Sequence, residues 1–290
     1  NTVAGPLFND APSGGSSVVT TDEGNIPGMG SQHETPATQP FGAATDGSFK
    51  MELHGADATV SIGGTELKVE NGKLYYNGVE VTADAAVSVP GGAHGTLTVT
   101  GMDADGTVHY TYTLTTPVDA TGNASNRPGE GDAGRGEAVH ADAFDVSITT
   151  TGGTATGQIT VDALDDAPVL STLDTTQTTV ADGEAALTGT LSFTPGADAE
   201  GAQVTVEVEG QTFTGTKGEN GWTFTGGSDG SSFQLNGTAF TYTRPSSNTT
   251  DGRNDTIILK VTVTDGDGDT AEQSVTVNTV AGPLFEGAPS

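Results

Sequence analysis

Three aspartates alternate with two glycines in the segment Asp265-Gly266-Asp267-Gly268-Asp269. Glycine lets a backbone curl until carboxylate and carbonyl oxygens converge, and Ca²⁺ takes about six to eight such oxygen ligands. The segment is not an EF-hand loop, because the twelfth position counted from Asp265 is Thr276, where that loop carries a glutamate. The pattern predicts a Ca²⁺ site formed by Asp265, Asp267 and Asp269. The alternative is a polar hairpin tip without an ion.

A second acidic group, Asp162, Asp165 and Asp166, stands just before Ala167-Pro168. This position is the expected junction of two domains, where a shared cation would lock the hinge. The alternative is a solvated linker.

The third candidate is weaker. Asp103 and Asp105 lie in a short loop between two expected strands, where a polar turn is favoured over an ion. The pairs Asp198 with Glu200 and Asp251 with Asp255 are weaker still. The hairpin tip at residues 149–154 contains no aspartate, so we expect no ion there.

Sequence motifs for catalysis are missing. The five histidines, at positions 33, 54, 94, 109 and 140, show no His-x-x-x-His spacing. No nucleophile elbow, phosphate-binding loop or dinucleotide-binding fingerprint occurs. Paired carboxylates can hydrolyse glycosides, but one Trp and five Tyr are few for a sugar cleft. We therefore expect a protein that is not an enzyme.

Charge and composition exclude further classes. With 9 Lys and Arg against 38 Asp and Glu, the formal net charge is −29, which opposes binding to nucleic acid and to anionic lipid. No apolar run is long enough for membrane insertion. The absence of cysteine excludes disulfides, thiolate zinc sites and cysteine nucleophiles.

Short alternating runs of Thr, Val, Tyr and Phe, separated by Gly, Asp, Asn and Pro, predict many antiparallel strands. Asn71-Gly72 is a strong hairpin signal between two of these runs. The expected strands are 49–53, 59–62, 66–70, 73–76, 79–82, 95–100, 108–114, 144–149 and 155–162, followed by 187–194, 203–209, 211–215, 222–225, 232–235, 239–243, 256–264 and 272–278. We expect residues 13–45 to form an irregular loop and 117–141 an insertion. Trp222 is expected to be a core anchor.

The two ends of the sequence repeat each other. Residues 1–13 and 278–290 are identical at eleven of thirteen positions, with an offset of 277 residues. Chance does not produce such a match, so the sequence contains one period of a tandem array. We expect domain 1 at 10–163 and domain 2 at 164–279, flanked by linkers at 1–9 and 280–290. The apolar run at 280–285 would close its joint by packing.

The predicted fold is all-β, with two tandem immunoglobulin-like β-sandwich domains arranged end to end. The seven or eight strands expected in domain 2 match the size of such a sandwich.

Four segments resemble the repeats of RTX-type giant bacterial surface adhesins exported by type I secretion. They are residues 95–114 (GTLTVTGMDADGTVHYTYTL), 144–168 (FDVSITTTGGTATGQITVDALDDAP), 189–198 (GTLSFTPGAD) and 255–277 (DTIILKVTVTDGDGDTAEQSVTV). Residues 13–45 and 117–141 do not fit this pattern, and the 149–154 tip lacks the aspartates.

The resemblance implies an extracellular location on the bacterial cell surface and Ca²⁺ at turns and junctions. It further implies a non-catalytic extender repeat that projects adhesive modules and supports adhesion or biofilm. The expected partners are neighbouring repeats of the same chain, and the chain is expected to be a monomer. The alternative is a module that binds a cell-surface glycan or protein through the insertions 13–45 and 117–141.

Overall fold

The computed structural model describes residues 7–9, 16–30, 42–118, 137–181, 186–219, 221–228, 230–244 and 256–280. These residues divide into two compact units, unit 1 up to Asp166 and unit 2 from Ala167 onward. The division lies three residues after the predicted boundary at Ala163. None of the described residues forms a helix long and apolar enough to cross a membrane.

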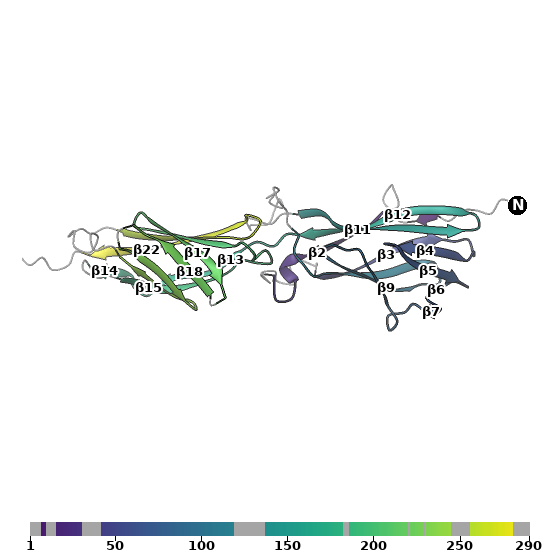
Figure 1. Cartoon of the computed structure of the whole chain (residues 1–290), viewed down its shortest axis with the longest axis horizontal. Helices are drawn as coiled ribbons and strands as arrows, with labels where there is room; N and C mark the ends of the chain where they lie inside the picture. Colours follow the sequence, from purple (N-terminus) through teal and green to yellow (C-terminus); the bar gives the residue numbers. More distant parts are fainter. Residues whose placement is uncertain are drawn as a thin grey trace, which may run out of the picture. The chain divides into compact units, whose positions relative to one another are not determined.

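Unit 1 consists of two sheets facing one another (Figure 1). The first sheet has the order β1 (Leu7–Asn9), β3 (Ala44–Glu52), β10 (Thr107–Leu114), β9 (Gly95–Met102) and β8 (Val87–Val89). The second has the order β2 (Ser16–Asp22), β12 (Gly153–Leu164), β11 (Glu137–Thr150), β4 (Ala58–Ile62), β5 (Thr65–Glu70), β6 (Lys73–Tyr76) and β7 (Val79–Glu80). A single 3-10 turn, η1 (Glu23–Asn25), follows β2.

Unit 2 repeats this plan with fewer strands. Its first sheet has the order β13 (Val169–Thr175), β15 (Ala186–Thr194), β20 (Ala239–Thr243) and β19 (Ser232–Asn236). Its second sheet has the order β14 (Thr179–Ala181), β22 (Thr270–Val280), β21 (Thr256–Thr264), β16 (Gln203–Val208), β17 (Gln211–Gly218) and β18 (Gly221–Gly226).

The two units share one topology. In each, a short early strand pairs in parallel with the last strand, β2 with β12 and β14 with β22, whereas the other ladders are antiparallel. Two packed sheets with crossed-over connections are the architecture of immunoglobulin-like sandwiches. The predicted all-β, immunoglobulin-like fold is thus confirmed for each unit.

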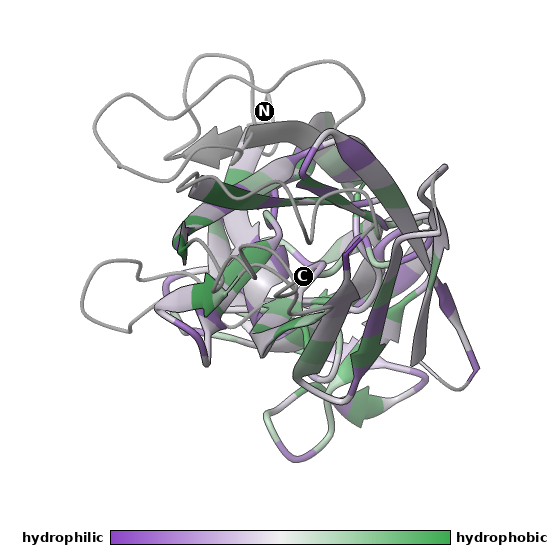
Figure 2. Ribbon diagram, turned by 90° about the vertical axis from the view of Figure 1, so that its left-hand side faces the viewer, coloured by the Kyte–Doolittle hydropathy of each residue, from purple (hydrophilic) through white to green (hydrophobic). Residues whose placement is uncertain are grey.

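Alternating side chains explain why these segments become strands. In β21, Ile257, Leu259, Val261 and Val263 are all at most 2% exposed, whereas the residues between them face outward or lie at the surface. This period of two places one apolar face on the core. Figure 2 shows apolar and polar stretches alternating along the strands.

A glycine under an aromatic ring recurs in both units. Gly47 of β3 lies opposite Tyr110, and Gly189 of β15 lies opposite Phe240. A Cβ atom at Gly189 would lie 2.5 Å from the Phe240 ring, so the ring occupies the space that a side chain would need. The same packing feature thus occurs at matching strands of the two units.

Two sequence expectations need correction. Residues 16–22, predicted as part of an irregular loop, form β2, because the parallel ladder with β12 satisfies a Ser- and Thr-rich segment with little apolar signal. The expected insertion 117–141 includes the start of β11, which begins at Glu137. Residues 31–41 and 119–136 lie outside the described residues, so binding by the insertions stays a prediction.

The predicted role of Trp222 is refined. Its ring is partly buried and lies edge-on to Phe193, with centroids 5.2 Å apart, at the margin of the unit 2 core. The centre of that core is instead filled by Phe213, Phe240 and Tyr242. Trp222 lies at the margin of the core because β18, which carries it, is an edge strand of the sheet.

Candidate metal centre

We call the end of a unit at which its first strand begins the entry end, and the end at which its last strand ends the exit end. The segment 265–269 connects β21 to β22 at the entry end of unit 2. The Asp265 N–H donates to the Asp269 carbonyl at 3.1 Å. Asp265 Oδ1 accepts from the N–H groups of Gly268 at 3.0 Å and Asp269 at 2.7 Å. The loop therefore curls around the Asp265 side chain, as its glycines predicted.

The three predicted carboxylates converge. One oxygen from each of Asp265, Asp267 and Asp269 lies within 4.8 Å of the others. Asp265 is only 4% exposed. Among the described residues, Asp265 Oδ2, Asp267 Oδ1 and Asp269 Oδ2 are buried oxygens with no hydrogen-bond partner. Buried acceptors are normally satisfied, so these three oxygens are candidate ligands for a cation.

Electrostatics at this loop oppose its own ionisation. Burial, followed by the neighbouring Asp267 carboxylate, raises the pKa of Asp265 well above its usual range. Burial, followed by the charge of Asp267, raises the pKa of Asp269 to about 6. Lys260, the nearest base along the chain, lies 2.8 Å from Glu272 and 3.7 Å from Glu207 instead. A cation would therefore supply the positive charge that this loop needs.

A second loop of unit 2 packs against the first. The Gly266 N–H donates to the Asp198 carbonyl at 2.7 Å. A Cβ atom at Gly266 would lie 2.2 Å from the Glu200 carbonyl oxygen, so only glycine allows this approach. The weak pair Asp198 and Glu200 thus borders the 265–269 loop, which spacing along the sequence does not show.

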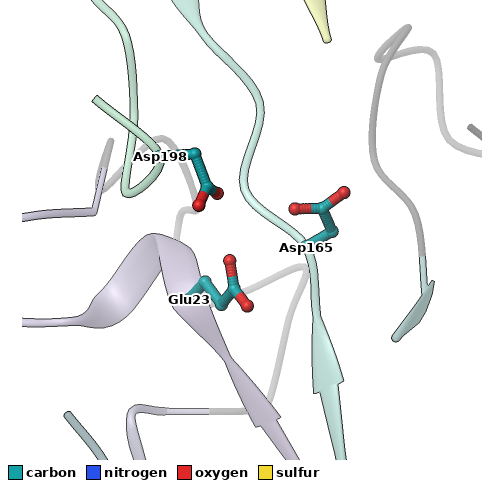
Figure 3. Close-up of side chains that lie close together, drawn as sticks. All are labelled: Glu23, Asp165 and Asp198. Atoms are coloured by element: carbon teal, nitrogen blue, oxygen red, sulfur yellow. The ribbon is translucent and has the colours of Figure 1, made fainter. Parts of the chain in front are cut away.

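The exit end of unit 1 holds a second set of acids. Asp22 and Glu23 are fully buried, and Asp165 and Asp166 are at most 2% exposed. Figure 3 shows Glu23, from η1, and Asp165, just after β12. A carboxylate oxygen of Glu23 lies within 4.8 Å of one from Asp165. Glu23 Oε1 accepts from the Val118 N–H at 2.6 Å, and Asp22 Oδ1 accepts from the Gly24 N–H at 2.9 Å.

Asp162 differs from its two predicted partners. It lies within β12, is half-buried, and its carbonyl oxygen accepts from Thr21 Oγ1 at 3.3 Å. Asp165 and Asp166 follow the strand and are buried. The geometry thus adds Asp22 and Glu23 to the acids at this end, and cation binding there stays a prediction.

The hairpin acids Asp103 and Asp105 are directed to two different bases. Asp103 Oδ2 lies 2.8 Å from His109 Nε2, and Asp105 Oδ2 lies 3.2 Å from Lys50 Nζ. Both side chains are more than half exposed. This arrangement favours the polar turn that the sequence offered as the alternative. Asp251 and Asp255 lie outside the described residues.

Sequence reasoning missed Asp22 and Glu23. They follow the Ser- and Thr-rich strand β2, and only the register of β2 with β12, in which Asp22 lies opposite Leu164, brings them beside Asp165. The Asp-Glu pair after a run of β-branched residues was the available signal.

No protein-family model matches the sequence, and no curated protein matches it. Solved structures are similar at low identity. A chimeric titin tandem carrying an exogenous fibronectin peptide is 13% identical with a TM-score of 0.28, covering 96% of this chain and 100% of that one. A tandem of two titin Ig domains is 9% identical with a TM-score of 0.26, covering 95% and 97%. SGBP-B of the Bacteroides ovatus mixed-linkage glucan utilisation locus, in complex with a mixed-linkage heptasaccharide, is 11% identical with a TM-score of 0.21, covering 95% and 47%.

Proposed function

We propose that this chain is a non-catalytic, Ca²⁺-stabilised extender repeat of a secreted bacterial surface adhesin. One observation carries the calcium part: Asp265 is buried with an oxygen that has no partner, and one carboxylate oxygen from each of Asp265, Asp267 and Asp269 lies within 4.8 Å of the others. The repeated ends of the sequence and the two units of one topology support the extender part.

The donor set fits a hard cation. Carboxylate oxygens favour Ca²⁺ or Mg²⁺ over softer metals. Ca²⁺ accepts irregular coordination at about 2.3–2.6 Å, whereas Mg²⁺ needs near-ideal octahedral geometry. A flexible glycine-containing loop with three carboxylates therefore favours Ca²⁺. Extracellular Ca²⁺ modules bind with dissociation constants of about 10⁻⁴–10⁻³ M, so such a site would fill outside the cell.

Ion binding would act through folding. Asp265, Asp267 and Asp269 repel one another in the folded loop, and the loop joins the last two strands of unit 2. A cation bound only by the folded loop stabilises unit 2 by mass action. The chain would then be less stable at low Ca²⁺ and more stable after secretion.

Calorimetry of the full chain tests the calcium part. Scans in Ca²⁺, in Mg²⁺ and in EDTA should show two transitions, of which the unit 2 transition rises in Ca²⁺ and much less in Mg²⁺. Identical scans in Ca²⁺ and EDTA would exclude a stabilising site.

Chains of one, two and three copies test the extender part. In Ca²⁺, the maximum particle dimension measured by small-angle scattering should grow in proportion to copy number. A compact particle whose size hardly increases would refute this role, whatever the calorimetry shows.

A further inference from the structure

The two units carry their clustered carboxylates at opposite ends, while separate acids, Asp57 and Asp105 among them, lie at the entry end of unit 1. Unit 1 has Asp22, Glu23, Asp165 and Asp166 at its exit end, and unit 2 has Asp265, Asp267 and Asp269 at its entry end. The remaining two ends, the entry of unit 1 and the exit of unit 2, are the ends that follow one another across a copy boundary.

The parallel ladders define which positions correspond at the two exit ends. In unit 1 the last pair is Asp22 with Leu164, and in unit 2 it is Ala181 with Val280. Asp165-Asp166 follow Leu164, whereas Ala281-Gly282 follow Val280. Asp22, Asp165 and Asp166 of unit 1 thus correspond to Ala181, Ala281 and Gly282, whereas Glu23 corresponds to another acid, Asp182. Val280 is 43% exposed.

The entry end of unit 1 is hollowed. A pocket of about 530 Å³ lies among the loops that connect β3 to β4, β5 to β6 and β9 to β10. Its lining combines the partly exposed apolar side chains Leu53 and Met102 with polar and charged residues, namely Lys50, Glu52, His54, Asp57, Asn71 and Asp105. Met51 and Val69, which also line it, are buried in the core. At its rim, Lys50 is paired with Asp105 at 3.2 Å. The neighbouring hairpin tip at 150–153 carries no acid.

The connection between copies is short. Residues 1–3 repeat Asn278-Thr279-Val280, the end of β22, and β1 begins at Leu7. Only Ala4-Gly5-Pro6 stand between them, and four peptide steps span at most about 14 Å. In an array, the exit end of unit 2 must therefore lie close to the hollowed entry end of the next unit 1.

We propose that the hollowed entry end of unit 1 is the docking surface for unit 2 of the preceding copy, and that this contact does not depend on a cation. The inference rests on the proposed array of repeats. The occupant is a second copy of this chain, which presents Ala181 and the exposed Val280 to the pocket end. The contact between consecutive copies would persist at Ca²⁺ concentrations too low to load the 265–269 loop.

Thiol reactivity in a chain of two consecutive copies tests the proposal, since the natural sequence has no cysteine. Ala104 lines the pocket and is exposed. Two variants are compared, one with Ala104→Cys in the first copy and one with Ala104→Cys in the second copy. Ser88→Cys on β8, exposed and away from the pocket, is the matched control. Labelling rates are measured in Ca²⁺ and in EDTA.

We expect the second-copy Ala104→Cys to react about tenfold more slowly than the first-copy variant, in both solutions, while Ser88→Cys reacts equally in both copies. Adding Val280→Asp to the first copy should remove the protection. Equal rates for Ala104→Cys in the two copies would overturn the docking surface. Protection in Ca²⁺ alone would overturn its independence of cations. Neither result depends on whether Ca²⁺ raises the melting temperature of a single copy, which tests the proposed function separately.

Discussion

The substitution Asp267→Asn separates two effects of the Asp267 charge: repulsion of the neighbouring carboxylates and binding of a cation. In the folded loop, its carboxylate oxygen lies within 4.8 Å of oxygens from Asp265 and Asp269. Two unit charges at that distance repel by about 0.9 kcal/mol in bulk water, and by about 3.5 kcal/mol at an effective dielectric constant of 20. Without an ion, the raised pKa of Asp265 keeps that carboxyl protonated near neutral pH, so Asp267→Asn removes mainly the repulsion between Asp267 and Asp269. With an ion, the same substitution removes an anionic ligand.

The expected result has opposite signs in the two solutions. In EDTA, the melting temperature of unit 2 should stay unchanged or rise in Asp267→Asn. In Ca²⁺ at 100 times the dissociation constant, the natural chain gains about 2.7 kcal/mol. At about 4 °C per kcal/mol for a domain of this size, that gain is an increment of roughly 10 °C. The variant should lose most of this increment.

Differential scanning calorimetry of the full chain, in Ca²⁺ and in EDTA, measures both quantities, and unit 1 serves as an internal reference. Asp174→Asn is the matched control, because Asp174 is an exposed acid of unit 2 whose Oδ1 accepts only from its neighbour's N–H in the described contacts. An unchanged Ca²⁺ increment in Asp267→Asn would place the stabilising ion elsewhere. A marked loss of stability in EDTA would show that Asp267 stabilises the loop without an ion.

Three further outcomes follow from the geometry. In EDTA, the unfolding free energy of unit 2 should fall as pH rises from 4 to 7. The reason is that the raised pKa values of Asp265 and Asp269 make the folded state bind more protons than the unfolded state. Urea titrations at each pH measure this free energy, and a rise with pH would contradict the prediction. Asp142→Ala should destabilise unit 1 by about 3 kcal/mol or more, because the buried carboxylate accepts from the N–H groups of Ala93, His94 and Gly95 and from the Tyr112 hydroxyl; a urea midpoint close to that of the natural chain would refute this role. Gly189→Ala should cost about 1–3 kcal/mol, since its Cβ would meet the Asp174 carbonyl and the Phe240 ring, whereas Gly218→Ala on β17 has room and should change the unit 2 midpoint little.

The sequence predicted the strands of both units well where alternation was strong. β21 carries an apolar residue at every second position, and a period of two has only one local solution when one face must be buried. The same holds for β5 and β6, whose Asn71-Gly72 turn adopts positive φ at both residues.

The sequence also located the 265–269 loop, because alternation of Asp with Gly is a local pattern that needs no distant partner. The burial of Asp265, by contrast, follows from the packing of residues 198–200 against Gly266. That packing depends on how β15, β16 and β21 are placed, which local spacing does not contain.

Only the tertiary structure decided the other acidic end. Asp22 and Glu23 are more than a hundred residues from Asp165 in sequence, and a Ser- and Thr-rich strand carries little apolar signal of its own. The parallel ladder of β2 with β12 fixes their register and buries them. Local pattern thus determined the elements and the residue types of this protein, whereas long-range strand pairing decided which carboxylates meet, because a ladder forms between segments whose sequences do not specify one another.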